Sequence, residues 1–181
     1  MPRFVALLRA VNVGGHRRVP MADLRELAGS LGFRDAATYI QSGNLAFRSD
    51  LGEEEAAARL ETAVERRFGF PVEVLVRSAA RWRRYLAANP FPAEAVREPD
   101  RVVLLLPKSP PPAGAVAALS ARAAKGERVV AAGDAAWAHF PEGIAPSKLT
   151  APLIDRLLGS PTTARNFRTV EALRDMLAGG A

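Results

Sequence analysis

The loop from Asn12 to Pro20, Asn-Val-Gly-Gly-His-Arg-Arg-Val-Pro, brings together residue types that can bind an anion. Gly14 and Gly15 can take a positive φ without steric cost, which frees the backbone around them. Free N–H groups ahead of a helix favour an anion, and Arg17 and Arg18 add positive charge. The loop therefore predicts a site for a small ligand that carries a phosphate or a carboxylate.

Other interpretations of this loop stay open. Asn-x-Gly-Gly is ordinary turn chemistry, and exposed arginines also serve solubility. His16 is an alternative acid or base for an enzyme of unassigned class, which requires a carboxylate or carbonyl to orient the ring and a cleft beside it. The phosphate-binding patterns Gly-x-Gly-x-x-Gly and Gly-x-x-x-x-Gly-Lys-Ser/Thr are both absent. The sequence assigns no catalytic residue.

The elements around the loop follow from hydrophobic spacing and from turn residues. In the first half we expect strands over 3–9, 36–40, 44–49 and 72–76, and helices over 20–32, 52–68 and 79–88. The second half repeats the order, with strands over 101–106, 127–132, 135–140 and 162–166, and helices over 113–124 and around 153–158. Gly133 and Asp134 mark a hairpin turn in that half, and Thr169 is a suitable N-cap for a terminal helix.

Strand, helix, strand, strand, helix, strand is the order of a ferredoxin-like, or split β-α-β, plait. The predicted class is therefore α+β, with two tandem ferredoxin-like plaits and a C-terminal helix. We expect an N-terminal plait over 1–88, a proline-rich linker over 89–100, and a C-terminal plait-like domain with the terminal helix over 101–181. Closely spaced prolines predict the linker, because proline does not continue a helix or a central strand.

The plait also predicts which segments meet. Its first two strands run parallel with the third between them, so their ends emerge at the same edge of the sheet. The Gln41-Ser-Gly-Asn44 turn should therefore lie beside the first loop, although Ser-Gly-Asn is also an ordinary hairpin tip. The predicted ligand-binding residues are Asn12, Gly14, Gly15, His16, Arg17, Arg18, Gln41, Ser42 and Asn44.

Secondary candidates lie in the second half. Lys148 follows a polar loop and could hold an anion, and Arg165 could make a bidentate contact with a carboxylate or phosphate next to Asn166. The alternative for the last two residues is an ion pair or a cap for the terminal helix. No metal site is expected, because the chain has two histidines and no cysteine. His139, on a strand face with Trp137, is interpreted as a structural residue.

Composition bears on partners and location. The net charge of +6 and the pI of about 10.6 can favour nucleic acid. We do not favour that partner, because the arginines are scattered and the RNA-recognition sequence is absent, although Phe4 and Phe47 lie on the expected first and third strands. No apolar run is long enough to cross a membrane, and the lack of cysteine fits the cytoplasm. The sequence indicates no cofactor.

Several segments together resemble the bacterial domain-of-unknown-function family 1697. They are Leu7-Leu-Arg-Ala-Val-Asn-Val-Gly-Gly15, Val19-Pro-Met21, Tyr39-Ile-Gln-Ser-Gly-Asn44, Pro141-Glu-Gly-Ile144 and Thr162-Thr-Ala-Arg-Asn-Phe-Arg-Thr169. Phe167 stands where the family commonly shows tryptophan. The resemblance implies two ferredoxin-like plaits and no established activity. It places Asn12, Gly14, Gly15, Gln41, Ser42, Gly43, Asn44, Arg165 and Asn166 in the family's characteristic loops.

Overall fold

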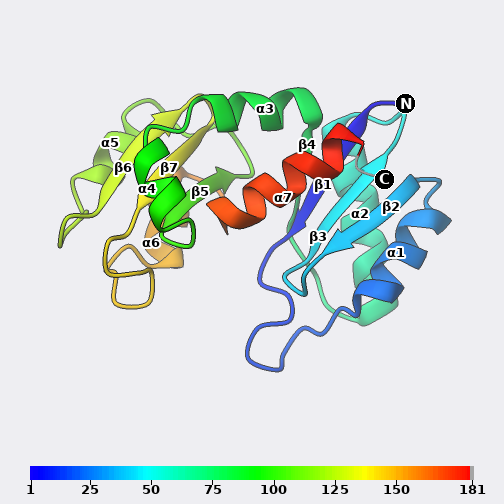
Figure 1. Cartoon of the computed structure of the whole chain (residues 1–181). Helices are drawn as coiled ribbons and strands as arrows, with labels where there is room; N and C mark the ends of the chain where they lie inside the picture. The colour runs from blue at the N-terminus through cyan, green and yellow to red at the C-terminus, as the bar shows by residue number, and fades with distance from the viewer. Residues whose placement is uncertain (180–181) are drawn as a thin grey trace. The chain divides into compact units, whose positions relative to one another are not determined.

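Two four-stranded antiparallel sheets with helices against them make up the computed structural model, which describes residues 1–179 (Figure 1). The α+β class predicted from the sequence is confirmed. One compact unit consists of Met1–Arg83 together with the chain from Ala172 onward, and the other of Arg84–Glu171. The division falls inside two helices, whereas the sequence predicts boundaries at residues 88 and 101.

The first unit holds a sheet with strand order β2-β3-β1-β4. Its elements are β1 (Arg3–Leu8), α1 (Met21–Ser30), β2 (Arg34–Tyr39), β3 (Asn44–Arg48), α2 (Glu53–Phe68) and β4 (Val74–Ser78). β3 pairs antiparallel with both β1 and β2, so Asn44 is opposite Leu7 on one side and Tyr39 on the other. β1 and β2 therefore run parallel and end at the same edge of the sheet.

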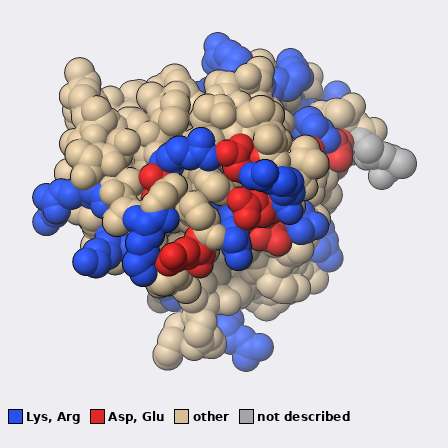
Figure 2. Space-filling view, turned by 60° about the vertical axis from the view of Figure 1, so that its left-hand side comes forward, with Lys and Arg blue, Asp and Glu red and all other residues tan. Residues whose placement is uncertain are grey.

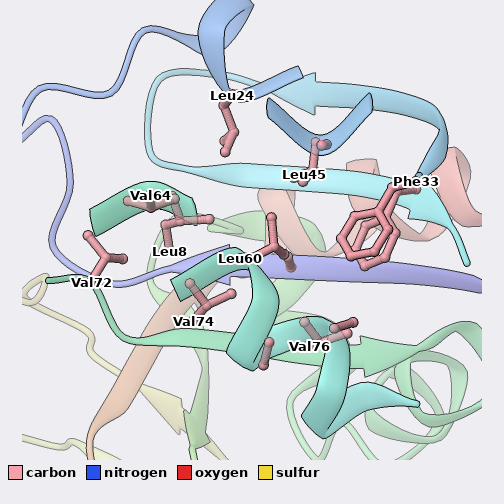
Figure 3. Close-up of a cluster of buried hydrophobic side chains, with 14 of the residues drawn as sticks. Leu8, Leu24, Phe33, Leu45, Leu60, Val64, Val72, Val74 and Val76 are labelled. Carbon is pink, nitrogen blue, oxygen red and sulfur yellow. The ribbon is translucent and has the colours of Figure 1, made fainter. Parts of the chain in front are cut away.

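A hydrophobic core lies between this sheet and the helices α1 and α2 (Figure 3). β1 contributes alternate residues to it, Phe4, Ala6 and Leu8, because successive strand side chains point to opposite faces. Leu24 of α1 and Leu60 of α2 meet them from the helical side, both fully buried. The three- and four-residue spacing of apolar residues in the helices thus becomes one packed layer.

The second unit repeats this connectivity, with strand order β6-β7-β5-β8. The remaining elements are α3 (Ala79–Ala87), α4 (Pro92–Arg97), β5 (Val102–Pro107), α5 (Ala115–Ser120), β6 (Arg128–Ala132), β7 (Ala135–His139), α6 (Ala151–Leu158), β8 (Thr162–Asn166) and α7 (Phe167–Ala178). Its core joins Val103 and Leu105 of β5 to Leu119 of α5 and Leu158 of α6.

Two local expectations need correction. Helix α4 lies inside the stretch expected to be a linker; it begins at Pro92, and proline fits the first helical turn because the N–H that it lacks would have no helical partner there. Helix α7 begins at Phe167, two residues before the expected N-cap Thr169. The Oδ1 atom of Asn166 accepts a hydrogen bond from the backbone N–H of Thr169 at 3.0 Å, so Asn166 is the cap.

Candidate functional site

Asn12 ties the first loop to the turn after β2. Its Nδ2 donates to the carbonyl oxygens of Val19 at 3.0 Å and Gln41 at 2.7 Å, and its Oδ1 accepts from the N–H of Val19 at 2.8 Å. The strand order brings these segments together, since β1 and β2 end at one edge. We call the surface formed by residues 12–20 and 40–44 the rim.

The two glycines of the rim form a tight turn. Gly14 and Gly15 have φ values of 59° and 78°, and the N–H of His16 donates to the carbonyl of Val13 at 3.1 Å. Two successive positive φ values are the signature of a type I′ turn, which glycine forms most easily. No other atom lies within 4 Å of where a Cβ would be at either glycine. The backbone conformation alone therefore explains the glycine pair.

Ser42 and Asn44 serve the second turn. The side chain of Asn44 is fully buried, and its Nδ2 donates to the carbonyl of Tyr39 at 3.0 Å and to Oγ of Ser42 at 2.8 Å. The carbonyl of Gly43 accepts from the N–H of Leu8 at 2.9 Å, which extends the pairing of β1 with β3 into the turn. These polar side chains hold the turn's shape.

Arg17 is directed at the segment before β4. Its guanidinium donates to the carbonyl of Pro71 and lies 5.5 Å from the centre of the Phe70 ring. This contact combines a hydrogen bond with a cation–π interaction. Arg17, which the sequence predicts to bind an anion, is therefore engaged in a contact within the chain.

Three polar side chains of the rim are exposed and without a partner in the described part of the chain. His16, Arg18 and Gln41 are exposed, and none of their side chains bonds to another residue within 1–179. No carboxylate or carbonyl in the described chain orients the His16 ring, which an acid–base role requires. The helix α1 begins directly after the rim with no side-chain cap bond, so N–H groups of its first turn add donors at this edge.

The secondary candidates are separate features of the second unit. Lys148 is exposed and bonds to no described residue. The guanidinium of Arg165 donates to Oγ1 of Thr163 at 2.8 Å, and burial lowers its pKa to about 10. Asn166 caps α7 and donates to the carboxylate of Asp100 at 3.1 Å. Asn166 therefore acts as a cap for the terminal helix, which was the alternative to ligand binding for this residue.

A polar network around His139 is the feature that sequence reasoning missed. Nε2 of the buried His139 lies 2.8 Å from Glu98, and Nδ1 lies 3.3 Å from the guanidinium of Arg128, which also pairs with Glu94. Arginine can only donate, so Nδ1 accepts and Nε2 carries the proton that Glu98 accepts. A two-residue hairpin turn at 133–134 places Arg128 of one strand opposite His139 of the next. The sequence therefore already contained the information that these two residues are neighbours.

This network lowers the pKa values of its two carboxyl groups, Glu98 and Glu94. The hydrogen bond from His139 is the largest cause that holds the pKa of Glu98 below its ordinary value, and nearby Arg101 adds to it. The hydrogen bond from Arg128 lowers the pKa of Glu94 in the same way. Arg128 also lies 4.7 Å from the ring centre of Phe91. Because every polar group here has a partner, the network has the character of a structural feature.

Neither a cluster of metal-ligating side chains nor a membrane-spanning helix occurs within residues 1–179. Within 1–179, no three His, Cys, Asp or Glu side chains gather where they could hold a metal ion. None of the helices in that range has the length and apolar character needed to span a membrane.

The basic charge is interrupted by acidic side chains. Figure 2 shows lysine and arginine side chains interleaved with aspartate and glutamate across the face that it presents. Phe4 and Phe47, the aromatics that an RNA-binding sheet would expose, are 5% and 2% exposed and pack in the core with Phe33. These two aromatic rings are therefore not available to stack on bases.

Both segments of the rim lie in the part of the chain that matches a protein family. The family described as "Protein of unknown function (DUF1697)" matches residues 1–137, about three quarters of the 181-residue chain. The chain belongs to this family. The DUF1697 match includes both segments of the rim and ends before the segments 141–144 and 162–169, so Lys148, Arg165 and Asn166 lie outside it.

A solved structure shares the fold of this DUF1697 protein. The conserved bacterial protein SP0830 from Streptococcus pneumoniae is 25% identical, with a TM-score of 0.76, over 97% of this chain and 98% of that one. No curated protein matches the chain.

Proposed function

We propose that this DUF1697 protein binds a small anion, with a phosphate or carboxylate group, on the rim. The hydrogen bond from Asn12 to the carbonyl of Gln41 is the observation that carries the proposal. It fixes two loops of different parts of the chain against each other before any ligand arrives. Groups that are already in place lose less conformational entropy on binding, which favours affinity.

Three exposed side chains supply the contacts. Arg18 offers a planar guanidinium that suits the paired oxygens of a carboxylate or phosphate. Gln41 offers a neutral amide donor, and His16 offers a ring N–H. The uncapped first turn of α1 adds backbone N–H groups at the positive end of the helix.

The remaining predicted residues act indirectly. Asn12, Ser42 and Asn44 hold the two turns, and the paired glycines shape the first turn. Arg17 is held by Phe70 and Pro71, so the proposal does not assign it to the ligand. Arg18 is thus the arginine whose removal should matter.

We propose that the two sheets are tandem ferredoxin-like plaits, since each unit has the order strand, helix, strand, strand, helix, strand with the third strand between the first two. We place the protein in the cytoplasm, because a chain of 181 residues without cysteine suits a reducing compartment.

Titration calorimetry with inorganic phosphate, nucleoside monophosphates and dicarboxylates tests the proposal, after a thermal-shift screen of the same compounds. We expect at least one compound to bind and to raise the melting temperature. The variant Arg18→Ala should weaken that binding by about tenfold or more, because an arginine–anion contact is a charge-assisted hydrogen bond.

Arg122→Ala is the matched control, since Arg122 is an exposed arginine in the second unit with no side-chain partner among the described residues. It removes the same charge and should leave the affinity unchanged. Equal weakening by both variants would show that net charge alone attracts the ligand. Failure of every anion to bind would reject the proposal.

A further inference from the structure

A groove of about 590 Å³ runs between α1 and α2 on the surface of the first unit. Leu27 and Leu31 line it from the end of α1, and both are only partly buried. Ala58, Thr62 and Ala63 of α2 add small side chains to the lining. Small side chains at successive turns let another helix approach closely, at the 8–10 Å between axes that is usual for packed helices.

Charges are distributed unequally along the groove. Glu55 lies near the start of α2, whereas Arg66 and Arg67 lie near its end. Glu55 pairs with Arg59 of its own helix at 2.7 Å, and Arg67 pairs with Glu26 at 3.8 Å. The side chain of Arg66 has no partner among residues 1–179. Arg59 lines the groove as well, so one end carries the Glu55–Arg59 ion pair. The other end carries two arginines, of which Arg66 is unpaired among the described residues.

This pattern is complementary to itself when α2 is reversed. If a second α2 packs antiparallel about a two-fold axis near its middle, Glu55 faces the partner's Arg66, and Ala58 faces the partner's Ala63. Glu55 of each copy then lies between its own Arg59 and the partner's Arg66, and small side chains meet near the centre. A two-fold interface uses the same patch on both copies, so each contact occurs twice.

We infer that this groove is a homodimer interface in which α2 packs antiparallel on α2 of a second copy of the chain. Such a dimer covers Leu27 and Leu31 of both copies and gives each Arg66 a carboxylate partner. The chain itself supplies a carboxylate and an arginine, Glu55 and Arg66, at positions that face each other in this register, so a second copy is the occupant.

Charge reversal tests the inference. Light scattering during gel filtration and sedimentation equilibrium would be run on the full chain and on Glu55→Arg, Arg66→Glu and the double variant. The unmodified protein should have twice the chain mass of 19.4 kDa. Each single variant should raise the dimer Kd at least about tenfold through like-charge contacts, and the double variant should restore it.

Glu54→Arg is the matched control. Glu54 is the neighbouring exposed residue of the same first turn, and it does not line the groove. Replacing it removes the same favourable negative charge from the start of the helix as replacing Glu55 does. Circular dichroism would confirm that every variant keeps its helices. A dimer Kd that is restored in the double variant, and in neither single variant, supports the antiparallel register.

Three outcomes would overturn the inference. They are a protein that stays at the monomer mass up to about 0.5 mM, a dimer that Glu54→Arg weakens as much as Glu55→Arg, and a double variant as monomeric as the single ones. None of these measurements involves the rim, so they are independent of anion binding.

Discussion

Gly43 and Val11 leave no space between them for a methyl group. A Cβ on Gly43 would lie 2.6 Å from Cγ2 of Val11 and 2.8 Å from Cβ of Leu8, and Gly43 has a φ of 77°. The turn after β2 therefore packs directly on the residues that follow β1. Gly43 is required both by its backbone conformation and by this close approach.

Gly43→Ala should destabilise the protein by about 2–4 kcal/mol, because it combines a steric overlap with a strained backbone. Urea unfolding followed by circular dichroism measures the change. Gly14→Ala is the control, since Gly14 has a φ of 59° but no atom within 4 Å of the added Cβ. It should cost only about 1 kcal/mol. Equal costs would show that packing contributes nothing at Gly43.

Asn12→Gly should destabilise the protein by about 1–3 kcal/mol, because it removes the hydrogen bonds to Val19 and Gln41. Asn12 has a φ of 56°, so Asn12→Ala should cost about 1 kcal/mol more through backbone strain. Hydrogen exchange of the rim amides should rise in both variants. Unchanged exchange in Asn12→Gly would mean that Asn12 does not hold the two loops together.

Acid should weaken the second unit through its lowered carboxylate pKa values. Glu98 has a folded pKa below its ordinary 4.5, chiefly because of the bond from His139, and Asp100 has one below its ordinary 3.8, chiefly because of Arg168. A lowered folded pKa gives stability that is present above the unfolded value and lost as pH falls through the folded value. Unfolding midpoints should therefore decrease as pH falls below about 4.5.

Glu98→Gln should reduce that decrease, because the amide oxygen still accepts from His139 but carries no charge. Urea midpoints at about pH 7, 5, 4 and 3 would be compared between the two proteins. Glu54→Gln, at an exposed residue without a partner among those described, should change nothing. An identical pH profile for Glu98→Gln and the unmodified protein would contradict the prediction.

Asn166→Ala should destabilise the protein by about 0.5–2 kcal/mol, because the first turn of α7 loses the side-chain acceptor for the N–H of Thr169. Asn166→Ser keeps an oxygen that can cap the helix and should recover most of the loss. Thermal unfolding followed at the helical circular dichroism band measures both. Thr169→Ala should not reproduce the loss of the cap, in contrast to what the sequence predicts.

Periodic patterns were sufficient for most elements of the fold. Alternation in β1 and three- to four-residue spacing in α1 and α2 identify strand and helices, because each pattern depends only on residues that are near in the chain. The strand and helix order follows directly. Helix α4 was missed because its proline was interpreted as a residue that ends a helix. Proline is also common at the first position of a helix, which is where Pro92 lies.

The candidate site was only partly accessible to such reasoning. Parallel strands that end at one edge indicate that the two rim segments meet, and the bond between Asn12 and Gln41 joins them across 29 residues. The sequence cannot show that Arg17 bonds to Pro71, 54 residues later, while Arg18 has no side-chain partner within residues 1–179. Neighbouring arginines are equivalent in any local pattern.

The sequence by itself determined the α+β class, the order of the strands and of the helices other than α4, the glycine turns and the family. The tertiary structure alone decided which polar side chains bond to other parts of the chain and which stay exposed without a partner among the described residues. The physical reason is range: propensity and periodicity depend on neighbours along the chain, whereas the partner of a side chain depends on strand register and on distant segments that packing brings together.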